Sequence, residues 1–257
     1  MPLRPLRKHR WVISITVLWL ILVASTIPAT WMAYTLQNIS PNWHIHNVSG
    51  SFWQGTAQKS QLLIDGHPFL LGELKWQFNP LSLLWLKPCI NISTRLEQQV
   101  LSTTACLSIL SGKLQLQNSQ LSFDAVSLEP WLIVRLRGDV DMQITSIVMK
   151  NEHVYEADGV ITWRQAQFHN SQTWVDLGNL QARLTDDETG GLLGRINEAG
   201  QGPLITDLTI AAPKEGGIKV SGDIIPKNTA QPAIHDILQI IGKSDNQGRY
   251  SIEWQDG

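Results

Sequence analysis

The chain has 257 residues, of which 43% are hydrophobic and 16% charged, as in folded proteins with one large domain or two small ones. The segment 1–10 is basic through Arg4, Arg7, Lys8 and Arg10, and no other charged residue occurs before Lys59. Without these four, 16 basic residues stand against 22 acidic ones; this formal charge of −6 argues against a nucleic-acid-binding protein, which needs a basic surface to neutralise phosphates.

An uncharged apolar stretch, residues 11–33, follows the basic segment. As a helix it would be roughly 34 Å long, enough to cross a bilayer core of about 30 Å. The positive-inside rule keeps the basic segment in the cytoplasm and places the rest of the chain across the membrane. A cleaved signal peptide, cut near Ser25, is the alternative, although no clean cleavage motif is present and the apolar stretch is long for a signal core. Both interpretations put the body outside the cytoplasm.

Residues 34–42 are polar and predict a short linker, so the folded body is expected at 43–257. Its strongest strand pattern lies in residues 48–80, where Leu74, Trp76 and Phe78 alternate with polar residues. Asp65 and Gly66 form a hairpin turn pair upstream of this strand. These features predict a meander of three strands.

Alternation continues through most of the remaining body, interrupted by an apolar helical turn at 80–86 and a long polar loop at 185–202. A single amphipathic helix is predicted at 232–241, where Ile234, Ile237, Leu238 and Ile241 recur at helical spacing. The expected fold is mainly β: one transmembrane helix, then a curved antiparallel sheet with one short helix near the C-terminus. Further strands are expected at 89–94, 100–107, 112–123, 138–144, 154–167, 177–184, 206–211, 217–225 and 248–254.

Cys89 and Cys106 are the two cysteines, and they flank a predicted hairpin whose midpoint lies between Glu97 and Gln98. A symmetric turn at this point places them directly opposite each other, within disulfide range, and an oxidising compartment would keep the bond. Two free buried thiols, or a redox or metal role, are the other interpretations, although two cysteines alone make no metal site.

Two internal similarities point to a repeat of about a hundred residues. A first set, Gly50, Trp53 and Ala57, resembles Gly159, Trp163 and Ala166. A second set pairs Leu71, Gly72 and Leu74 with Leu177, Gly178 and Leu180. Two related β-meanders, 43–130 and 131–257, would explain both sets, and chance similarity between strands of like composition is the alternative.

Groups suited to catalysis or metal binding are isolated from one another. His44 and His46 share a strand face but lack a third ligand, and the acidic residues 186–188 lack the spacing of a calcium loop. Asp139 and Asp141 fall on the wet face of a strand, which disfavours an acid–base pair. Nucleotide-binding, nucleophile-elbow and zinc-protease motifs are missing, so we expect no catalytic residue, metal or cofactor.

The chain resembles the type II secretion system protein N family, the N component of the general secretion pathway. The resemblance rests on the basic N-terminus, the single span and two motifs. The first motif, G-x-x-W-x-G-x-A, corresponds to Gly50, Trp53, Gly55 and Ala57. The second, L-G-x-L-x-W-x-x-x-P, corresponds to Leu71, Gly72, Leu74, Trp76 and Pro80.

This resemblance implies a single-pass protein of the inner membrane, with its N-terminus in the cytoplasm and its body in the periplasm. It implies an accessory component of the machine that exports folded proteins across the outer membrane, acting through contacts with other secretion components and without enzymatic activity or cofactor. The alternative is a periplasmic module that holds a lipid or other amphipath on an apolar concave sheet, lined by some of the eleven tryptophans. An extracytoplasmic hydrolase is disfavoured because no nucleophile and base are paired.

Overall fold

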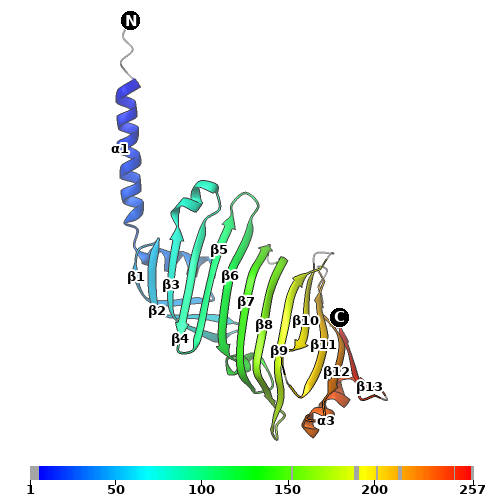
Figure 1. The fold of residues 1–257 in the computed structure, drawn as a ribbon. Coiled ribbons are helices and arrows are strands. Elements are labelled where there is room, and N and C mark those ends of the chain that lie inside the picture. The colour runs from blue at the N-terminus through cyan, green and yellow to red at the C-terminus, as the bar shows by residue number, and fades with distance from the viewer. Residues whose placement is uncertain are drawn as a thin grey trace.

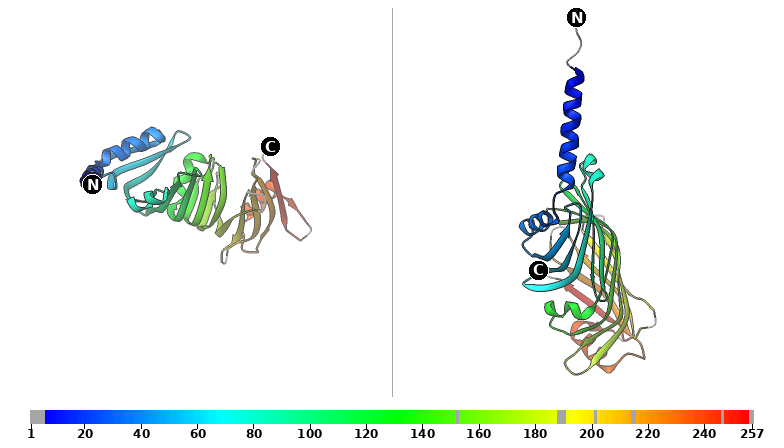
Figure 2. Two further views of the ribbon diagram at one scale, coloured as in Figure 1. Left: turned by 90° about the horizontal axis from the view of Figure 1, so that it is seen from above. Right: turned by 90° about the vertical axis from the view of Figure 1, so that its left-hand side faces the viewer.

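The computed structural model describes residues 6–151, 153–187, 191–200, 202–213, 216–245 and 247–255. These residues form one sheet of fourteen antiparallel strands, twisted and curved along its length (Figures 1 and 2). Strands that follow each other in sequence lie side by side, and only the last two exchange places, in the order β12-β14-β13. The predicted antiparallel, mainly β architecture is therefore confirmed.

The strands vary from two residues to seventeen, and the longest lie in the middle of the sheet. They are β1 (Trp43–Gly50), β2 (Gln54–Ile64), β3 (His67–Asn79), β4 (Cys89–Leu96), β5 (Gln99–Ser108), β6 (Lys113–Asp124), β7 (Leu136–Lys150), β8 (His153–His169), β9 (Trp174–Asp186), β10 (Leu192–Glu198), β11 (Leu204–Ala212), β12 (Lys219–Pro226), β13 (Lys243–Ser244) and β14 (Tyr250–Gln255).

Within the described residues, three α-helices and two 3-10 helices accompany the sheet. They are α1 (Leu6–Ser25), α2 (Ala29–Ile39), α3 (Pro232–Ile241), η1 (Pro80–Trp85) and η2 (Ala125–Trp131). Helix α1 projects away from the sheet, whereas α3 lies at the far end of the strand order (Figure 1). The helix predicted at 232–241 is confirmed at both ends.

The helix expected over residues 11–33 is interrupted between α1 and α2. Pro28 has no N–H to donate, and its ring disfavours helical geometry at Ile27. The β1–β2 turn bonds to carbonyls around this break: the Phe52 N–H donates to the Ile27 carbonyl at 2.8 Å, and Trp53 Nε1 donates to the Ala24 carbonyl at 2.7 Å. The turn therefore fixes the point at which α1 leaves the sheet.

Most of the expected linker, 34–42, is helical, because α2 extends through Ile39. Ala29 and Ala33 of this helix are buried, so the last part of the expected span packs on the sheet. Among the residues that the structure describes, no helix combines the length and the hydropathy needed to cross a membrane. The predicted span is thus not confirmed.

The long loop predicted at 185–202 is wrong, because β10 occupies 192–198. Its sequence, LLGRINE, has only a short alternation, and the strand exists through its pairing with β9 on one side and β11 on the other. Pairing with distant segments cannot be read from local periodicity.

The hairpin of β4 and β5 turns at Glu97 and Gln98 and pairs Cys89 with Cys106, as the symmetric spacing predicts. The two cysteines form a disulfide. It joins the start of β4 to the end of β5, directly below the η1 segment.

Replacing both cysteines by alanine should lower the free energy of unfolding by about 3 kcal/mol, because a cross-link over a sequence separation of 17 restricts the unfolded chain. Urea unfolding with and without reductant measures this difference. Reductant should lower the midpoint of the unaltered protein to that of the double variant and leave the variant where it is. Equal midpoints for both proteins without reductant would contradict the expectation.

Candidate functional site

The two faces of the sheet differ in polarity. The strand registers place side chains of the same kind next to each other, so that they form rows across the strands. One row crosses twelve strands, β2 to β12 and β14, and is apolar except for Thr94 and Gly222. Its members in strand order are Ala57, Leu74, Thr94, Leu101, Leu121, Met142, Ile161, Ala182, Ile196, Leu208, Gly222 and Ile252. At about 4.8 Å between strands, the row is on the order of 50 Å long.

The neighbouring row faces the other way and is polar except for Val160, because side chains alternate along a strand. Its members are Thr56, Lys75, Ser93, Ser102, Gln120, Gln143, Val160, Arg183, Arg195, Thr209, Ser221 and Glu253. The sheet is therefore apolar on one face and wet on the other over nearly its whole width.

Short helical segments cover parts of the apolar face. Helix α2 packs Ala29, Met32 and Leu36 on the first strands, η2 packs Ala125 and Leu128 on the middle strands, and α3 packs Ile234 and Leu238 on the last strands. Figure 1 shows η2 and α3 at the same end of the strands. The apolar face between these covers is not filled by helices.

An apolar cavity of about 530 Å³ lies under η2. Leu128, Trp131 and Leu132 of the η2 segment form one side, and the other side comes from β1–β3 and β5–β7. Trp131 Nε1 donates to the Ile64 carbonyl at 3.0 Å, which holds η2 against the end of β2. The strand residues that line the cavity are Trp43, Leu62, Ile64, Phe69, Leu71, Leu101, Leu121, Phe123 and Met142.

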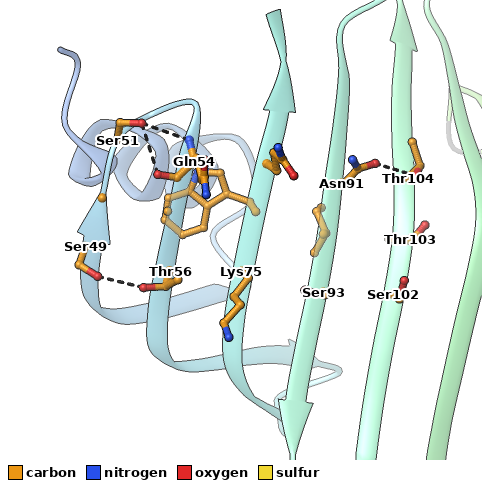
Figure 3. Close-up of a pocket in the computed structure, with 15 residues that line it drawn as sticks. Ser49, Ser51, Gln54, Thr56, Lys75, Asn91, Ser93, Ser102, Thr103 and Thr104 are labelled. Atoms are coloured by element: carbon orange, nitrogen blue, oxygen red, sulfur yellow. Dashed lines mark hydrogen bonds between the residues drawn. The ribbon is translucent and has the colours of Figure 1, made fainter. Parts of the chain in front are cut away.

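A second hollow, of about 620 Å³, is lined mostly by polar side chains of β1–β5 (Figure 3). The hydroxyls of Ser49 and Thr56 lie 2.9 Å apart, and the Thr104 hydroxyl donates to Asn91 Oδ1 at 2.8 Å. Lys75 pairs with Glu73 at 3.2 Å. These groups bond among themselves and provide hydroxyl and amide contacts rather than a nucleophile paired with a base.

The residues of the first motif build the junction between α1, α2 and the sheet. Gly55 lies under the ring of Trp76, and a Cβ at this position would come within 2.3 Å of that ring. Trp76 is buried, and its Nε1 donates to the Phe52 carbonyl at 3.1 Å. Ala57 is fully buried in the same cluster. Trp53 packs edge-on against Phe78, with ring centroids 5.2 Å apart.

The second motif has a similar structural role. Leu71, Leu74 and Trp76 are buried, and Pro80 begins η1 after Asn79. Gly72 has a φ of +72° at an irregularity in the β2–β3 pairing, where a Cβ would come within 2.4 Å of the Arg95 carbonyl. Both motifs therefore maintain the fold at the N-terminal end of the sheet.

The structure aligns one of the two residue sets that suggested a repeat and not the other. Gly72 and Gly178 have φ of +72° and +78°, and both lie at irregularities, opposite buried Ser60 and Ala166. With these glycines aligned, the position equivalent to Trp163 is Ala57, because Leu74 pairs with Ala57 and Leu180 with Trp163. The set of Gly50, Trp53 and Ala57 is thus out of step with Gly159, Trp163 and Ala166. The repeat itself remains a prediction.

Groups considered for catalysis or metal binding lie apart. Asp141 pairs with Arg164 at 2.6 Å, and Asp187 Oδ1 accepts the Gly191 N–H at 2.7 Å. Within the described ranges, no three His, Cys, Asp or Glu residues are grouped so that they could hold a metal ion. Glu188 and Arg4 fall outside the described residues, as do the side chains of Arg7, Lys8 and Arg10.

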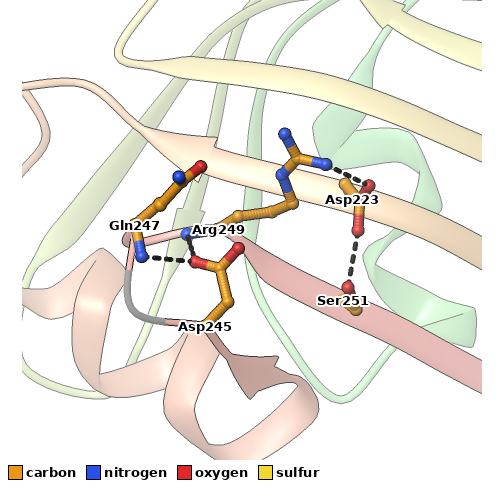
Figure 4. A network of polar contacts seen from close by, with 5 residues as sticks. All are labelled: Asp223, Asp245, Gln247, Arg249 and Ser251. Atoms are coloured by element: carbon orange, nitrogen blue, oxygen red, sulfur yellow. Dashed lines mark hydrogen bonds and ion pairs between the residues drawn. The ribbon is translucent and has the colours of Figure 1, made fainter.

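A polar network closes the last hairpin of the sheet (Figure 4). The backbone N–H groups of Arg249 and Gln247 donate to Asp245 Oδ1, and these bonds lower the pKa of that carboxyl. Arg249 also pairs with Asp223 at 3.5 Å, and the Ser251 hydroxyl donates to Asp223 at 2.7 Å. The network orients β13 and β14 at the edge of the sheet.

Sequence alternation identified the strand faces but missed their alignment into rows, because register depends on turns and bulges. The alternation pattern also did not predict that the leucines of η1 are exposed, because in the sequence they belong to an apolar segment. The available signal was the segment from Leu81 to Leu86, which is apolar except for Ser82.

Residues 41–253 match the family model described as type II secretion system (T2SS), protein N. No curated protein and no solved structure gives a significant match to the chain.

Thr94→Val should leave stability unchanged or raise it by about 1 kcal/mol, because the Thr94 hydroxyl is buried in the apolar row without a hydrogen-bond partner. Thermal and urea unfolding measure the change. Thr103→Val is the matched control on β5, since the Thr103 hydroxyl lies 2.6 Å from that of Ser119 and its loss should destabilise the protein. A clear loss of stability in Thr94→Val would show that its hydroxyl has a partner.

Proposed function

The chain belongs to the type II secretion system protein N family, and on this premise we propose that it is a non-catalytic accessory component of type II secretion. The match covers nearly the whole sheet and carries this proposal. The protein supports export of folded proteins from the periplasm across the outer membrane, and it acts through contacts with other secretion components.

In this proposal α1 anchors the protein in the inner membrane, and the sheet lies in the periplasm. Exposed apolar side chains along α1, including Trp11, Leu18, Trp19 and Leu22, support it because they pack on nothing in the body. The basic residues before them favour a cytoplasmic N-terminus. The disulfide is consistent with an oxidising compartment.

The free edge at β14 is the contact surface that we assign to partner proteins. Within the described residues, β13 pairs with β14 only at Tyr250 and Ser251, so the strand from Ile252 to Gln255 has an unpaired side. Trp254 of this strand and Ile240 of neighbouring α3 are exposed apolar residues. A partner strand added here would gain main-chain hydrogen bonds and apolar contacts.

Deleting the gene should reduce export of type II substrates, and a photo-crosslinking amino acid at Trp254 should capture a secretion component that mass spectrometry identifies. The matched control is the same amino acid at Gln143, in the middle of the polar face, which should capture it far less. Unchanged export together with unchanged inner-membrane assemblies would refute the assignment.

A second candidate function is binding of a lipid or other amphipath, which the cavity under η2 favours. Its volume of about 530 Å³ falls in the range of small-molecule sites, about 300–1,000 Å³, and its lining is apolar. The apolar row continues from Leu121 and Met142 in both directions along the sheet.

A photoreactive fatty acid fed to cells should label the full-length protein on peptides that contain Leu121 or Met142. Leu121→Glu should abolish this labelling by placing a charge in the cavity, whereas Gln120→Glu, its neighbour on the polar face, should not. Leu121→Trp fills the cavity without a charge and should also reduce labelling, so the result does not rest on one variant. Equal labelling in all four proteins would exclude the cavity as a lipid site.

A further inference from the structure

Seven exposed apolar residues lie in two turns next to α1. Leu84 of η1 is 78% exposed, Trp85 is 83% exposed, and Leu110 in the β5–β6 turn is 83% exposed. Leu81, Leu83, Leu86 and Ile109 are exposed beside them. We call these seven residues the apolar tips. Exposed large side chains in such a group have a free-energy cost in water, and they mark contact with an apolar partner.

The two turns are fastened together and form one surface. The Leu107 N–H donates to the Pro88 carbonyl at 2.9 Å, and the Ile109 N–H donates to the Leu86 carbonyl at 3.0 Å. The Cys89–Cys106 disulfide crosses between the same strands immediately below these bonds. The covalent link and the two bonds hold the tips in a fixed relation.

The apolar tips lie at the end of the strands from which α1 departs. In an antiparallel meander, the β1–β2, β3–β4 and β5–β6 connections lie at one end, and the β1–β2 turn is bonded to α1 through Trp53. Figure 1 and the right-hand view of Figure 2 show the β3–β4 connection, in cyan, at the level of the last turn of α1.

The next two turns at this end of the strands are polar. Exposed apolar residues are therefore not a general feature of the turns at this end. The β7–β8 turn contains Asn151 after Lys150, and the β9–β10 connection begins with Asp187 after Asp186 at the end of β9. Apolar exposure is therefore strong in the two turns near α1 and falls with distance from it.

Charges beside the tips are basic. From Pro80 to Asn91 and from Thr103 to Gln115, the charged residues in the sequence are Lys87 and Lys113. Lys113 is exposed, and Lys87 Nζ donates to the neutral Gln115 side chain at 2.9 Å. Leucine and tryptophan tips flanked by lysine match the boundary between acyl chains and anionic headgroups, where tryptophan is enriched and lysine is attracted to the surface.

We propose that the apolar tips are a second membrane contact, which inserts into the outer leaflet of an anionic bilayer beside α1 and fixes the angle of the sheet to the membrane. This inference rests on the proposed function only in its use of α1 as the anchor. A single helix would let the whole protein rotate about the helix axis and tilt in the bilayer, whereas two contacts define an orientation. The bilayer is favoured over a protein partner because the tips reach toward α1 and their charged neighbours are basic.

The test uses the full-length protein in vesicles of phosphatidylethanolamine and phosphatidylglycerol that contain nitroxide-labelled lipid. An environment-sensitive fluorescent amino acid is placed, one at a time, at Leu84, Leu110, Leu18 and Ile133. We expect a blue shift and loss of intensity at Leu84 and Leu110 as at Leu18 in α1. Ile133, which is fully exposed at the opposite end of the strands, is the matched control and should keep its intensity.

Three outcomes are separable. Quenching at Leu18 without quenching at Leu84 and Leu110 overturns this inference and leaves the anchor intact, and the tips would then belong to a protein interface. An unquenched probe at Leu18 contradicts the anchor itself. Equal quenching at Ile133 and the tips means nonspecific adsorption and also overturns the inference.

The charge contribution has its own test. Lys113→Glu should reduce quenching at Leu110 in the anionic vesicles, with no such loss in vesicles of phosphatidylcholine alone. Lys219→Glu, on β12 far along the strand order, is the control and should change neither. Identical quenching for both variants in anionic vesicles would exclude attraction between Lys113 and the headgroups.

Discussion

The described part of the chain forms one sheet with one apolar face, and the need to cover that face shapes the rest of the molecule. The rows that contain Leu121 and Gln120 show how complete the separation of faces is across the strands. Exposing apolar surface to water costs a free energy of about 25 cal/mol per Å². A face of this width therefore has to be covered. Curvature of the sheet and three short covers, α2, η2 and α3, meet the requirement in part. The cavity under η2 lies where the covering is incomplete.

The N-terminal junction depends on tryptophan chemistry in two forms. Trp76 provides buried area over Gly55, while Trp53 uses its indole N–H to bond the end of α1. Removal of either would loosen a different connection, since Trp76 holds the β1–β2 turn to β3 and Trp53 holds α1 to the sheet. The motif that carries the family resemblance therefore sets the geometry between α1 and the sheet.

Local patterns predicted what depends on local chemistry. Period-two alternation predicted most strands, and helical spacing predicted α3 with both of its end residues. Equal spacing around Glu97 and Gln98 predicted the pairing of the two cysteines. The failures share one cause, which is that distant contacts decided the outcome. Helix α2 is stabilised because Ala29 and Ala33 are buried against the sheet. Strand β10 forms because it pairs with β9 on one side and β11 on the other. The cavity and the apolar tips depend on register and on strand ends, neither of which alternation encodes.

In this chain, position in sequence is also position in space, because the strands follow one another across the sheet. Residues near the N-terminus therefore lie next to α1, and those near the C-terminus lie farthest along the sheet from it. The apolar tips lie in the β3–β4 and β5–β6 connections and the unpaired edge belongs to β14. The membrane contact and the protein contact that we propose therefore lie far apart along the strand order. The apolar row and the neighbouring polar row both cross the strands that separate the two surfaces.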